Sequence, residues 1–236
     1  MKLKKYKTAS ETSRALIERT LDLMQENKKE NFHIALSGGG TPALLFDIWA
    51  NEYRSKTDWE RICFYWVDER CVAPEDSDSN YGMTKKLLLS KVPLVKSQIF
   101  RIRGEDDPEE EAKRYTELTL NNMTVSNGFP VFDLVMLGAG DDGHTSSIFP
   151  GQEELLTTKQ PFAACHNPYN GQNRIAITGQ TIIAAKVVAF LITGENKADV
   201  VADIYSSGDT GPAAYVAHHS SHVELYVDNE AASAIK

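Results

Sequence analysis

Cysteine is scarce in this chain. Its 236 residues include three cysteines, Cys63, Cys71 and Cys165, which form no CxxC pair and show no spacing typical of metal ligands. A sparse, odd count is typical of free thiols in a reducing compartment. Cys63 stands within an apolar run, so we expect it to be a small core residue rather than a reactive group.

Long apolar runs and an excess of positive charge are also missing. No run approaches the ~20 apolar residues that span a bilayer, and the basic segment MKLKKYKTAS has no apolar stretch behind it, unlike a secretory signal. The net charge is −8, which disfavours nucleic acid and anionic membranes as partners. We therefore expect a cytoplasmic protein, a monomer or weak homo-oligomer, whose anionic ligands would need a locally positive pocket.

Apolar strand patterns alternate with helical ones along the whole chain. With 42% hydrophobic residues and no linker or internal repeat, residues 1–236 are predicted to form one domain. The alternation predicts an α/β fold with a mainly parallel central sheet covered by helices on both faces. The predicted strands are 32–36, 62–68, 97–102, 132–138, 187–193 and 223–228, with a possible short strand within the irregular stretch 160–171. The predicted helices run from a capping box at Thr8 and Glu11 to Met24, then over 41–49, 80–90, 107–123 and 195–206, with a short one at the C-terminus.

A glycine-rich turn follows the first of these strands. Ser37, Gly38, Gly39 and Gly40 lead into Thr41 and Pro42, which resemble an N-cap followed by an N1 proline. Glycines let the backbone approach a ligand, and a helix N-terminus offers N–H groups to an anion. A plain flexible turn is the alternative, but we favour phosphate binding. The GxxxxGK[ST] pattern of ATP-binding loops is absent.

Charged residues follow other strands at what should be the same edge of the sheet, because ligands of open α/β sheets bind beyond the carboxyl ends of their strands. Asp68 and Arg70 come after Val67 at the end of one strand, and an arginine suits forked contact with a phosphate. Arg174 begins the segment RIAIT, and Lys197 stands at a helix start, where the helix dipole disfavours a cation. A bound anion would explain the lysine at that position, although each of the two residues alone is more often a surface charge.

The segment after the strand at 132–138 carries the candidate base. GAGDDG matches the GxGxxG pattern, but two acidic residues inside the loop and no prompt helix argue against a dinucleotide site. Asp142 and His144 offer a better interpretation, since a histidine oriented by a carboxylate can act as a general base. A structural loop histidine is the alternative.

Two other chemistries have little support. His218, His219 and His222 could share a helix face, but no acidic or cysteine ligand pattern accompanies them, so we predict no metal site. Ser146 and Ser147 do not stand in GxSxG, which disfavours a serine-nucleophile hydrolase.

These motifs, in this order, resemble the family of 6-phosphogluconolactonases and glucosamine-6-phosphate isomerases/deaminases. The matching stretches are residues 36–42 (LSGGGTP), 66–70 (WVDER), 79–81 (SNY), 138–151 (GAGDDGHTSSIFPG), 174–178 (RIAIT) and 194–198 (GENKA).

The resemblance implies a three-layer αβα fold of the NagB/RpiA/CoA-transferase type and hydrolysis of 6-phosphoglucono-1,5-lactone, without a cofactor, in the oxidative pentose phosphate pathway. It implies that His144 activates water beside Asp142, and that residues 37–41, Arg70, Arg174 and Lys197 hold the phosphate or nearby oxygens.

Two other functions remain open at this point. In the deaminase branch the segment after the DGH motif usually runs to Asn-Glu-Pro, whose glutamate serves ring opening; here residues 147–151 (SIFPG) contain no carboxylate, which favours the lactonase. A sugar-phosphate sensor that retains the pocket without catalysis is the third possibility, disfavoured by the presence of both Asp142 and His144.

Overall fold

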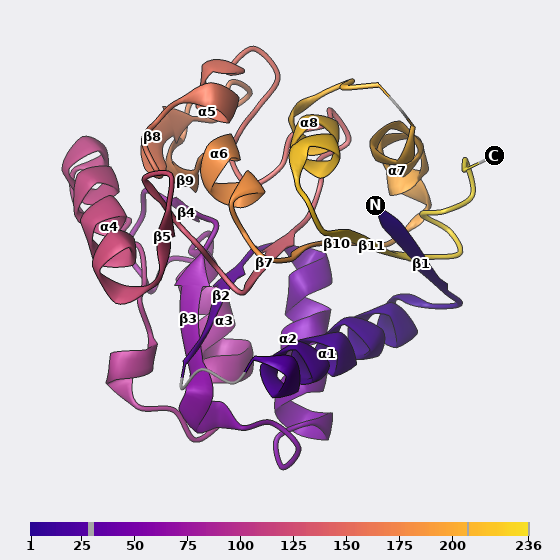
Figure 1. Cartoon of the computed structure of the whole chain (residues 1–236), viewed down its shortest axis with the longest axis horizontal. Helices are drawn as coiled ribbons and strands as arrows, with labels where there is room; N and C mark the ends of the chain where they lie inside the picture. Colours follow the sequence, from indigo (N-terminus) through magenta and orange to yellow (C-terminus); the bar gives the residue numbers. More distant parts are fainter. Residues whose placement is uncertain (28–30, 207, 236) are drawn as a thin grey trace.

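The computed structural model describes residues 1–27, 31–206 and 208–235, and a six-stranded parallel sheet runs through its centre (Figure 1). The strand order is β1-β11-β10-β7-β2-β3, with every neighbouring pair parallel. The strands are β1 (Lys2–Tyr6), β2 (Phe32–Leu36), β3 (Ile62–Trp66), β7 (Leu134–Leu137), β10 (Val188–Ile192) and β11 (Val223–Asp228). β7 and β10 are buried along their whole length, as expected of parallel strands covered on both faces.

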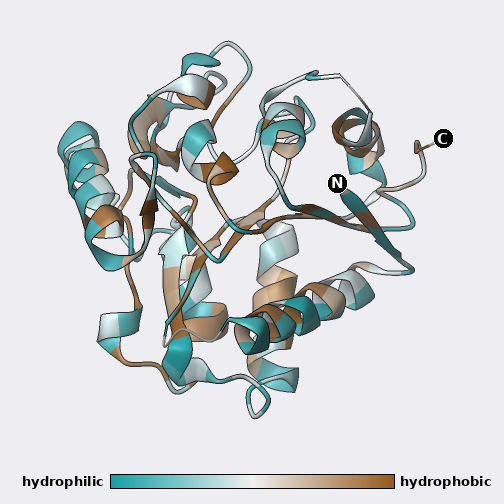
Figure 2. Ribbon diagram, viewed as in Figure 1, coloured by the Kyte–Doolittle hydropathy of each residue, from teal (hydrophilic) through white to brown (hydrophobic). Residues whose placement is uncertain are grey.

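Helices cover both faces of this sheet. α1 (Ala9–Glu26) and α2 (Gly40–Glu52) lie on one side of it, and α6 (Gly179–Ile183), α7 (Ala198–Tyr205) and α8 (Pro212–His219) lie on the other (Figure 1). Figure 2 shows the hydrophobic residues gathered along the central strands and on the inward sides of the helices. The result is the three-layer arrangement that the sequence predicts.

A second, antiparallel sheet stands beside the first. Its order is β4 (Asp68–Arg70), β9 (Asn173–Ile177) and β8 (Phe162–His166), and α4 (Pro108–Asn122) packs against it. β4 follows β3 after a single residue, so the chain passes directly from the parallel sheet into the antiparallel one. The remaining short elements are η1 (Trp59–Arg61), α3 (Asn80–Thr84), η2 (Lys85–Leu89), η3 (Lys96–Gln98), β5 (Val125–Ser126), β6 (Phe129–Pro130), α5 (Glu154–Thr157) and η4 (Glu195–Lys197).

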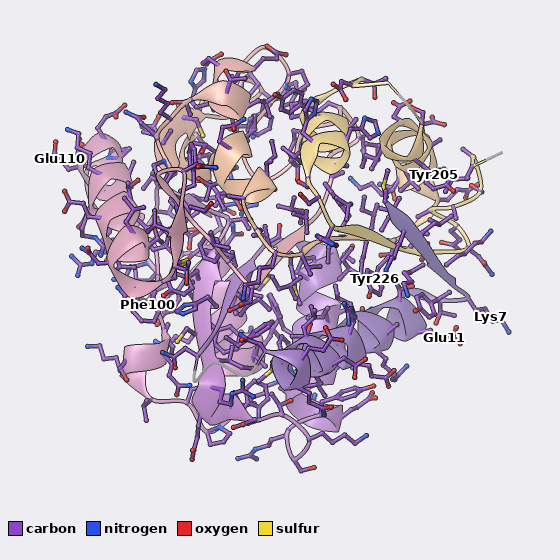
Figure 3. The ribbon with its side chains drawn as sticks, in the orientation of Figure 1. Lys7, Glu11, Phe100, Glu110, Tyr205 and Tyr226 are labelled. Carbon is purple, nitrogen blue, oxygen red and sulfur yellow. The ribbon has the colours of Figure 1, made fainter. Side chains whose placement is uncertain are left out.

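Most predicted elements are confirmed. The helix predicted over 80–90 is α3 continued by the π-helical turn η2, and the possible strand within 160–171 is β8. At α1, Thr8 caps the helix by accepting from the N–H of Glu11; the Glu11 carboxylate accepts from the N–H of Lys7 rather than from that of Thr8 (Figure 3).

Three predictions of local structure are wrong. Residues 97–102 form no regular strand, because the side-chain amide of Gln98 donates to the carbonyl oxygens of Trp59 and Ile62, and Ile99 makes only a single bridge to Phe64. Residues 229–234 form turns instead of a C-terminal helix. The N-cap of α2 is Gly39 rather than Thr41, so the helix begins at Gly40.

The order of strands creates a switch point between β2 and β7. After β2 the chain adds β3 on one side, and it later returns to place β7 on the other side. Such reversals open a crevice beyond the carboxyl ends of the two strands. The glycine turn after β2 and the loop after β7, which carry the two most distinctive motifs, therefore meet at one place.

Candidate active site

A pocket of about 380 Å³ opens at this switch point. It is walled by the turn after β2, the loop after β7, the end of β10 and the antiparallel sheet. All but one of the predicted site residues line it: Ser37, Gly38, Gly39, Gly40, Thr41, Asp68, Arg70, His144, Arg174 and Lys197. The exception, Asp142, is hydrogen-bonded to His144.

The glycine turn, residues 37–40, forms one wall of the pocket, and its glycines place no side chains there. Gly39 has a φ of 103°, a conformation that favours glycine, and none of the described side chains caps the first turn of α2. A Cβ at Gly38 would stand 1.8 Å from Oδ1 of Asn80, so only glycine allows Asn80 to approach this turn. The Thr41 hydroxyl does not cap α2 but lies 3.2 Å from the hydroxyl of Thr193. The N-terminal end of α2 is thereby left available to an anion.

Two arginines stand side by side on the antiparallel sheet. The register of β4 and β9 places Arg70 opposite Arg174. Arg70 donates through Nη1 to the carbonyl oxygen of Asp78 at 2.6 Å. Yet the Nε atoms of both arginines are buried without a hydrogen-bond partner among the described residues. Burial, and then the charge of Arg70, lower the pKa of Arg174.

A buried and a half-buried cation whose buried Nε donors are unsatisfied are costly unless an anion joins them. The arginine pair is therefore the strongest sign of an anion-binding site in the part of the chain that the structure describes. A phosphate matches it, because a planar guanidinium donates in a fork that suits phosphate oxygens.

Buried acidic residues hold the base of this wall. The carboxylate of Glu69 accepts hydrogen bonds from the N–H groups of Arg70, Asn80 and Tyr81 and from the hydroxyl of Ser79. Burial raises the pKa of Glu69 although the hydrogen bonds from the backbone N–H groups oppose the rise.

Asp68 is 5% exposed, and its carboxylate accepts from Ser147 Oγ at 2.5 Å and from Asn80 Nδ2 at 3.2 Å. Asp68 thus ties the antiparallel sheet to the loop after β7.

Asp142 and His144 form a hydrogen-bonded pair in the loop after β7. Nδ1 of His144 lies 2.6 Å from Oδ1 of Asp142, which also accepts from the His144 N–H at 3.1 Å. The hydroxyl of Tyr169 donates to the other oxygen, Oδ2, at 2.5 Å. Burial alone would raise the pKa of Asp142, but the bonds from Tyr169 and His144 outweigh it and lower that pKa.

The hydrogen bond to Asp142 defines which tautomer the neutral imidazole of His144 adopts. An ionised carboxylate only accepts, so Nδ1 of His144 carries the proton in the neutral ring and Nε2 bears the lone pair. Among the described residues, Nε2 has no hydrogen-bond partner, and the ring lines the pocket. The arrangement can accept a proton from a group in the pocket at Nε2.

Lys197 reaches the same loop from the start of α7. Its Nζ donates to the carbonyl oxygen of Ala139 at 3.0 Å and pairs with Asp141 at 2.6 Å. It lines the pocket, so its charge faces any ligand there even while Asp141 neutralises part of it.

Sequence reasoning missed several residues of this site. Asn80, Ser147, Phe149, Asn167 and Tyr169 all line the pocket. Asn80, Ser147 and Phe149 stood inside motifs already singled out, so their position was the available signal. Asn167 and Tyr169 come from the irregular stretch before Arg174, where no motif or periodicity marked them.

His218, near the C-terminus, makes hydrogen bonds at both ring nitrogens. Nδ1 of His218 lies 2.8 Å from Asp209, and its Nε2 lies 3.1 Å from the carbonyl oxygen of Ile204. Within residues 1–27, 31–206 and 208–235, no group of three His, Cys, Asp or Glu side chains is arranged to hold a metal ion. None of the helices in those ranges has the length and apolarity to cross a membrane.

Known proteins are similar to this chain in both sequence and fold. A 6-phosphogluconolactonase from Aggregatibacter actinomycetemcomitans is 41% identical over 205 residues, covering 85% of this chain and 86% of the relative. The structure of 6-phosphogluconolactonase from Trypanosoma brucei superposes with a TM-score of 0.89 at 26% identity, over 100% of this chain and 98% of that one.

A monomeric glucosamine-6-phosphate deaminase of the NagB superfamily superposes with a TM-score of 0.82 over 99% of this chain and 100% of its own, a likeness of fold at 22% identity. The three-layer fold predicted from the sequence is therefore the NagB-type fold. Residues 5–226 match the family described as glucosamine-6-phosphate isomerases/6-phosphogluconolactonase. By that match and by the relative at 41% identity, the chain belongs to this family.

Proposed function

We propose that this protein hydrolyses 6-phospho-D-glucono-1,5-lactone to 6-phospho-D-gluconate. The observation that carries the proposal is that one pocket is lined both by His144, oriented by Asp142, and by the Arg70–Arg174 pair with its unsatisfied donors. The name of the relative at 41% identity, a 6-phosphogluconolactonase, supports the same reaction. This reaction belongs to the oxidative pentose phosphate pathway, and we expect it to take place in the cytoplasm.

The phosphate would bind between Arg70 and Arg174, near the glycine turn and the N-terminal end of α2. Lys197 adds positive charge beside the loop after β7, which carries His144. Holding the phosphate fixes the lactone ring relative to His144, and such orientation contributes much of the rate in a two-body reaction.

His144 would act as the general base. Its Nε2 takes a proton from a water molecule whose oxygen attacks C1 of the lactone, and the carbonyl oxygen becomes an oxyanion. N–H groups of the glycine-rich loops are suited to stabilise that charge. The tetrahedral intermediate then collapses as the C1–O5 bond breaks, and the imidazolium returns the proton to the departing ring oxygen. A lactone carbonyl is already electrophilic, so this chemistry calls for neither a metal nor an organic cofactor.

The aldose–ketose isomerase/deaminase reaction fits the pocket less well. Ring opening and isomerisation need a further carboxylic acid to move protons, and Phe149 occupies the segment where the deaminase branch carries its glutamate. Its ring centroid lies 4.5 Å from that of His144. Asp68 is the one acidic residue among the described residues that line the pocket, and Ser147 and Asn80 already donate to it.

Replacing His144 by alanine tests the base. We expect kcat for the lactone to fall by about 10²–10⁴-fold, the usual contribution of general-base catalysis, with little change in KM. The assay uses freshly generated lactone and subtracts spontaneous ring opening. His222→Ala, an exposed histidine outside this pocket, serves as the matched control.

The outcomes separate the alternatives. Lactone hydrolysis by the wild-type chain that survives His144→Ala would remove His144 from the base role. Ammonia release from glucosamine 6-phosphate, without lactone hydrolysis, would assign the deaminase reaction instead. Binding of the sugar phosphate without either reaction would indicate a sensor.

A further inference from the structure

Tyr169 contacts two side chains, Asp142 and Phe149, that both contact His144. We propose that Tyr169 is a positioning residue: it holds the Asp142 carboxylate, and through it the His144 imidazole, in the orientation that presents Nε2 to the pocket. This inference rests on the proposed function, because it assigns His144 the role of base.

The first contact is a hydrogen bond to the carboxylate. Oδ1 of Asp142 receives both donors of His144, the ring Nδ1 at 2.6 Å and the backbone N–H at 3.1 Å. Oδ2 receives the hydroxyl of Tyr169 at 2.5 Å. With a donor on each oxygen, the carboxylate cannot rotate about its Cβ–Cγ bond without breaking a charge-assisted hydrogen bond. The plane of the carboxylate, and so the direction in which it holds the imidazole, is set from both sides.

The second contact runs through aromatic rings. The ring of Tyr169 meets Phe149 edge-on, with centroids 6.0 Å apart and an interplanar angle of 81°. Phe149 in turn lies against the imidazole of His144, with centroids 4.5 Å apart. Tyr169 therefore supports both neighbours that confine the His144 ring, the carboxylate at Nδ1 and the aromatic ring beside it.

Hydrogen bonds within the turn between β8 and β9 fix the backbone that carries Tyr169. Asn167 N–H donates to the carbonyl oxygen of Gln172, and Gly171 N–H donates to that of Asn167. The N–H of Tyr169 itself donates to Oδ1 of Asn167 at 2.8 Å. These bonds close the turn between β8 and β9. Tyr169 is 69% exposed, so burial does not hold its ring there; the hydroxyl bond to Asp142 and the edge-on contact with Phe149 orient it.

Tyr169→Phe removes the hydroxyl and keeps the ring. We expect kcat to fall about tenfold with KM within about twofold of wild type, because only the orientation of the base changes. Tyr205→Phe, a partly exposed tyrosine at the end of α7 and outside the pocket, is the matched control and should leave both constants unchanged (Figure 3).

The pathway through Asp142 is tested by a double-mutant cycle. If Tyr169 acts by holding Asp142, adding Tyr169→Phe to an Asp142→Asn variant should change kcat by less than about twofold. A full tenfold additional loss in the Asp142→Asn background would overturn the proposal, as would an unchanged kcat in Tyr169→Phe alone.

A readout without substrate separates this inference from the proposed function. In protein with ¹⁵N-labelled histidine, the ring signals of His144, assigned by their loss in His144→Ala, should report a proton on Nδ1. Tyr169→Phe should shift this Nδ1–H signal and speed its exchange with water, whereas Tyr205→Phe should not. An unaltered signal in Tyr169→Phe overturns the positioning role. An altered signal in a chain that hydrolyses no lactone supports the role while the proposed function fails.

Discussion

At the scale of the residue, one glycine makes room for the proposed base. A Cβ on Gly140 would stand 2.1 Å from Nδ1 of His144 and 2.6 Å from Oδ1 of Asp142. Real Cβ atoms do not approach other atoms this closely, so a side chain here would displace the ring, the carboxylate or both. The backbone φ of Gly140 is not positive, so its conformation does not call for glycine. Glycine is needed at this position because any Cβ would collide with His144 and Asp142.

Gly140→Ala should therefore lower kcat by more than tenfold, since even small misplacements of a catalytic group are costly, with little loss of folding stability. Gly208→Ala is the control, because its Cβ would meet only ordinary contact, at 3.7 Å from Thr210. Kinetics and thermal melting of both variants provide the measurement. Wild-type kcat in Gly140→Ala would show that the loop can relax without moving His144.

At the scale of the element, Glu69 joins β4 to the start of α3. Its carboxylate accepts the N–H groups of Arg70 in β4 and of Asn80 and Tyr81 in α3, and the hydroxyl of Ser79, which caps α3. These elements place Arg70 and Asn80 in the pocket, so Glu69, which is not among the described residues that line it, organises one of its walls.

Glu69→Ala leaves several buried donors without an acceptor, each costing about 1–3 kcal/mol. We expect the free energy of unfolding to fall by about 3 kcal/mol or more, accompanied by a rise in KM, because Arg70 loses its support. Denaturant titration measures the first effect and steady-state kinetics the second. Glu75→Ala, an exposed carboxylate in the connection between the same two elements, should be neutral. A neutral Glu69→Ala would contradict this account.

The elements that could be predicted from sequence are those whose pattern is local. The buried strands β7 and β10 are runs of apolar residues, and α4 begins with Asp107 accepting from the N–H groups of Glu109 and Glu110. The segment 97–102 looked equally strand-like, but the side-chain amide of Gln98 donates to the carbonyl oxygens of Trp59 and of Ile62 at the start of β3, and Ile99 pairs with Phe64 as an isolated bridge. β1 was missed because its lysines hide an edge strand that, among the described strands, pairs with β11 alone.

At the scale of the whole molecule, an acidic protein keeps a cationic pocket. The net charge is −8, yet Arg70, Arg174 and Lys197 face one cavity. A phosphate that enters it satisfies buried donors and so binds the folded state in preference to the unfolded one, which raises stability by mass action.

Inorganic phosphate should therefore raise the melting temperature. At a concentration of 100 times its Kd the gain is about 2.7 kcal/mol, or roughly 5–10 °C for a chain of this size. Sodium chloride at equal ionic strength should not reproduce the gain. Arg70→Ala should lose most of it, and Arg54→Ala, an exposed arginine outside the pocket, should keep it. The same gain in both variants would place the anion elsewhere.

The sequence by itself determined most of the strands and helices of the central sheet and which side chains follow its strands, because apolar spacing, glycine and capping act over a few residues. That was enough to expect the glycine turn, the arginines and His144 at one edge of a parallel sheet. The tertiary structure decided what those residues do to one another. The register of β4 and β9 pairs Arg70 with Arg174, and the turn between β8 and β9 brings Tyr169 to Asp142. These are contacts between residues distant in the chain, whose meeting depends on strand register and packing that no local pattern records.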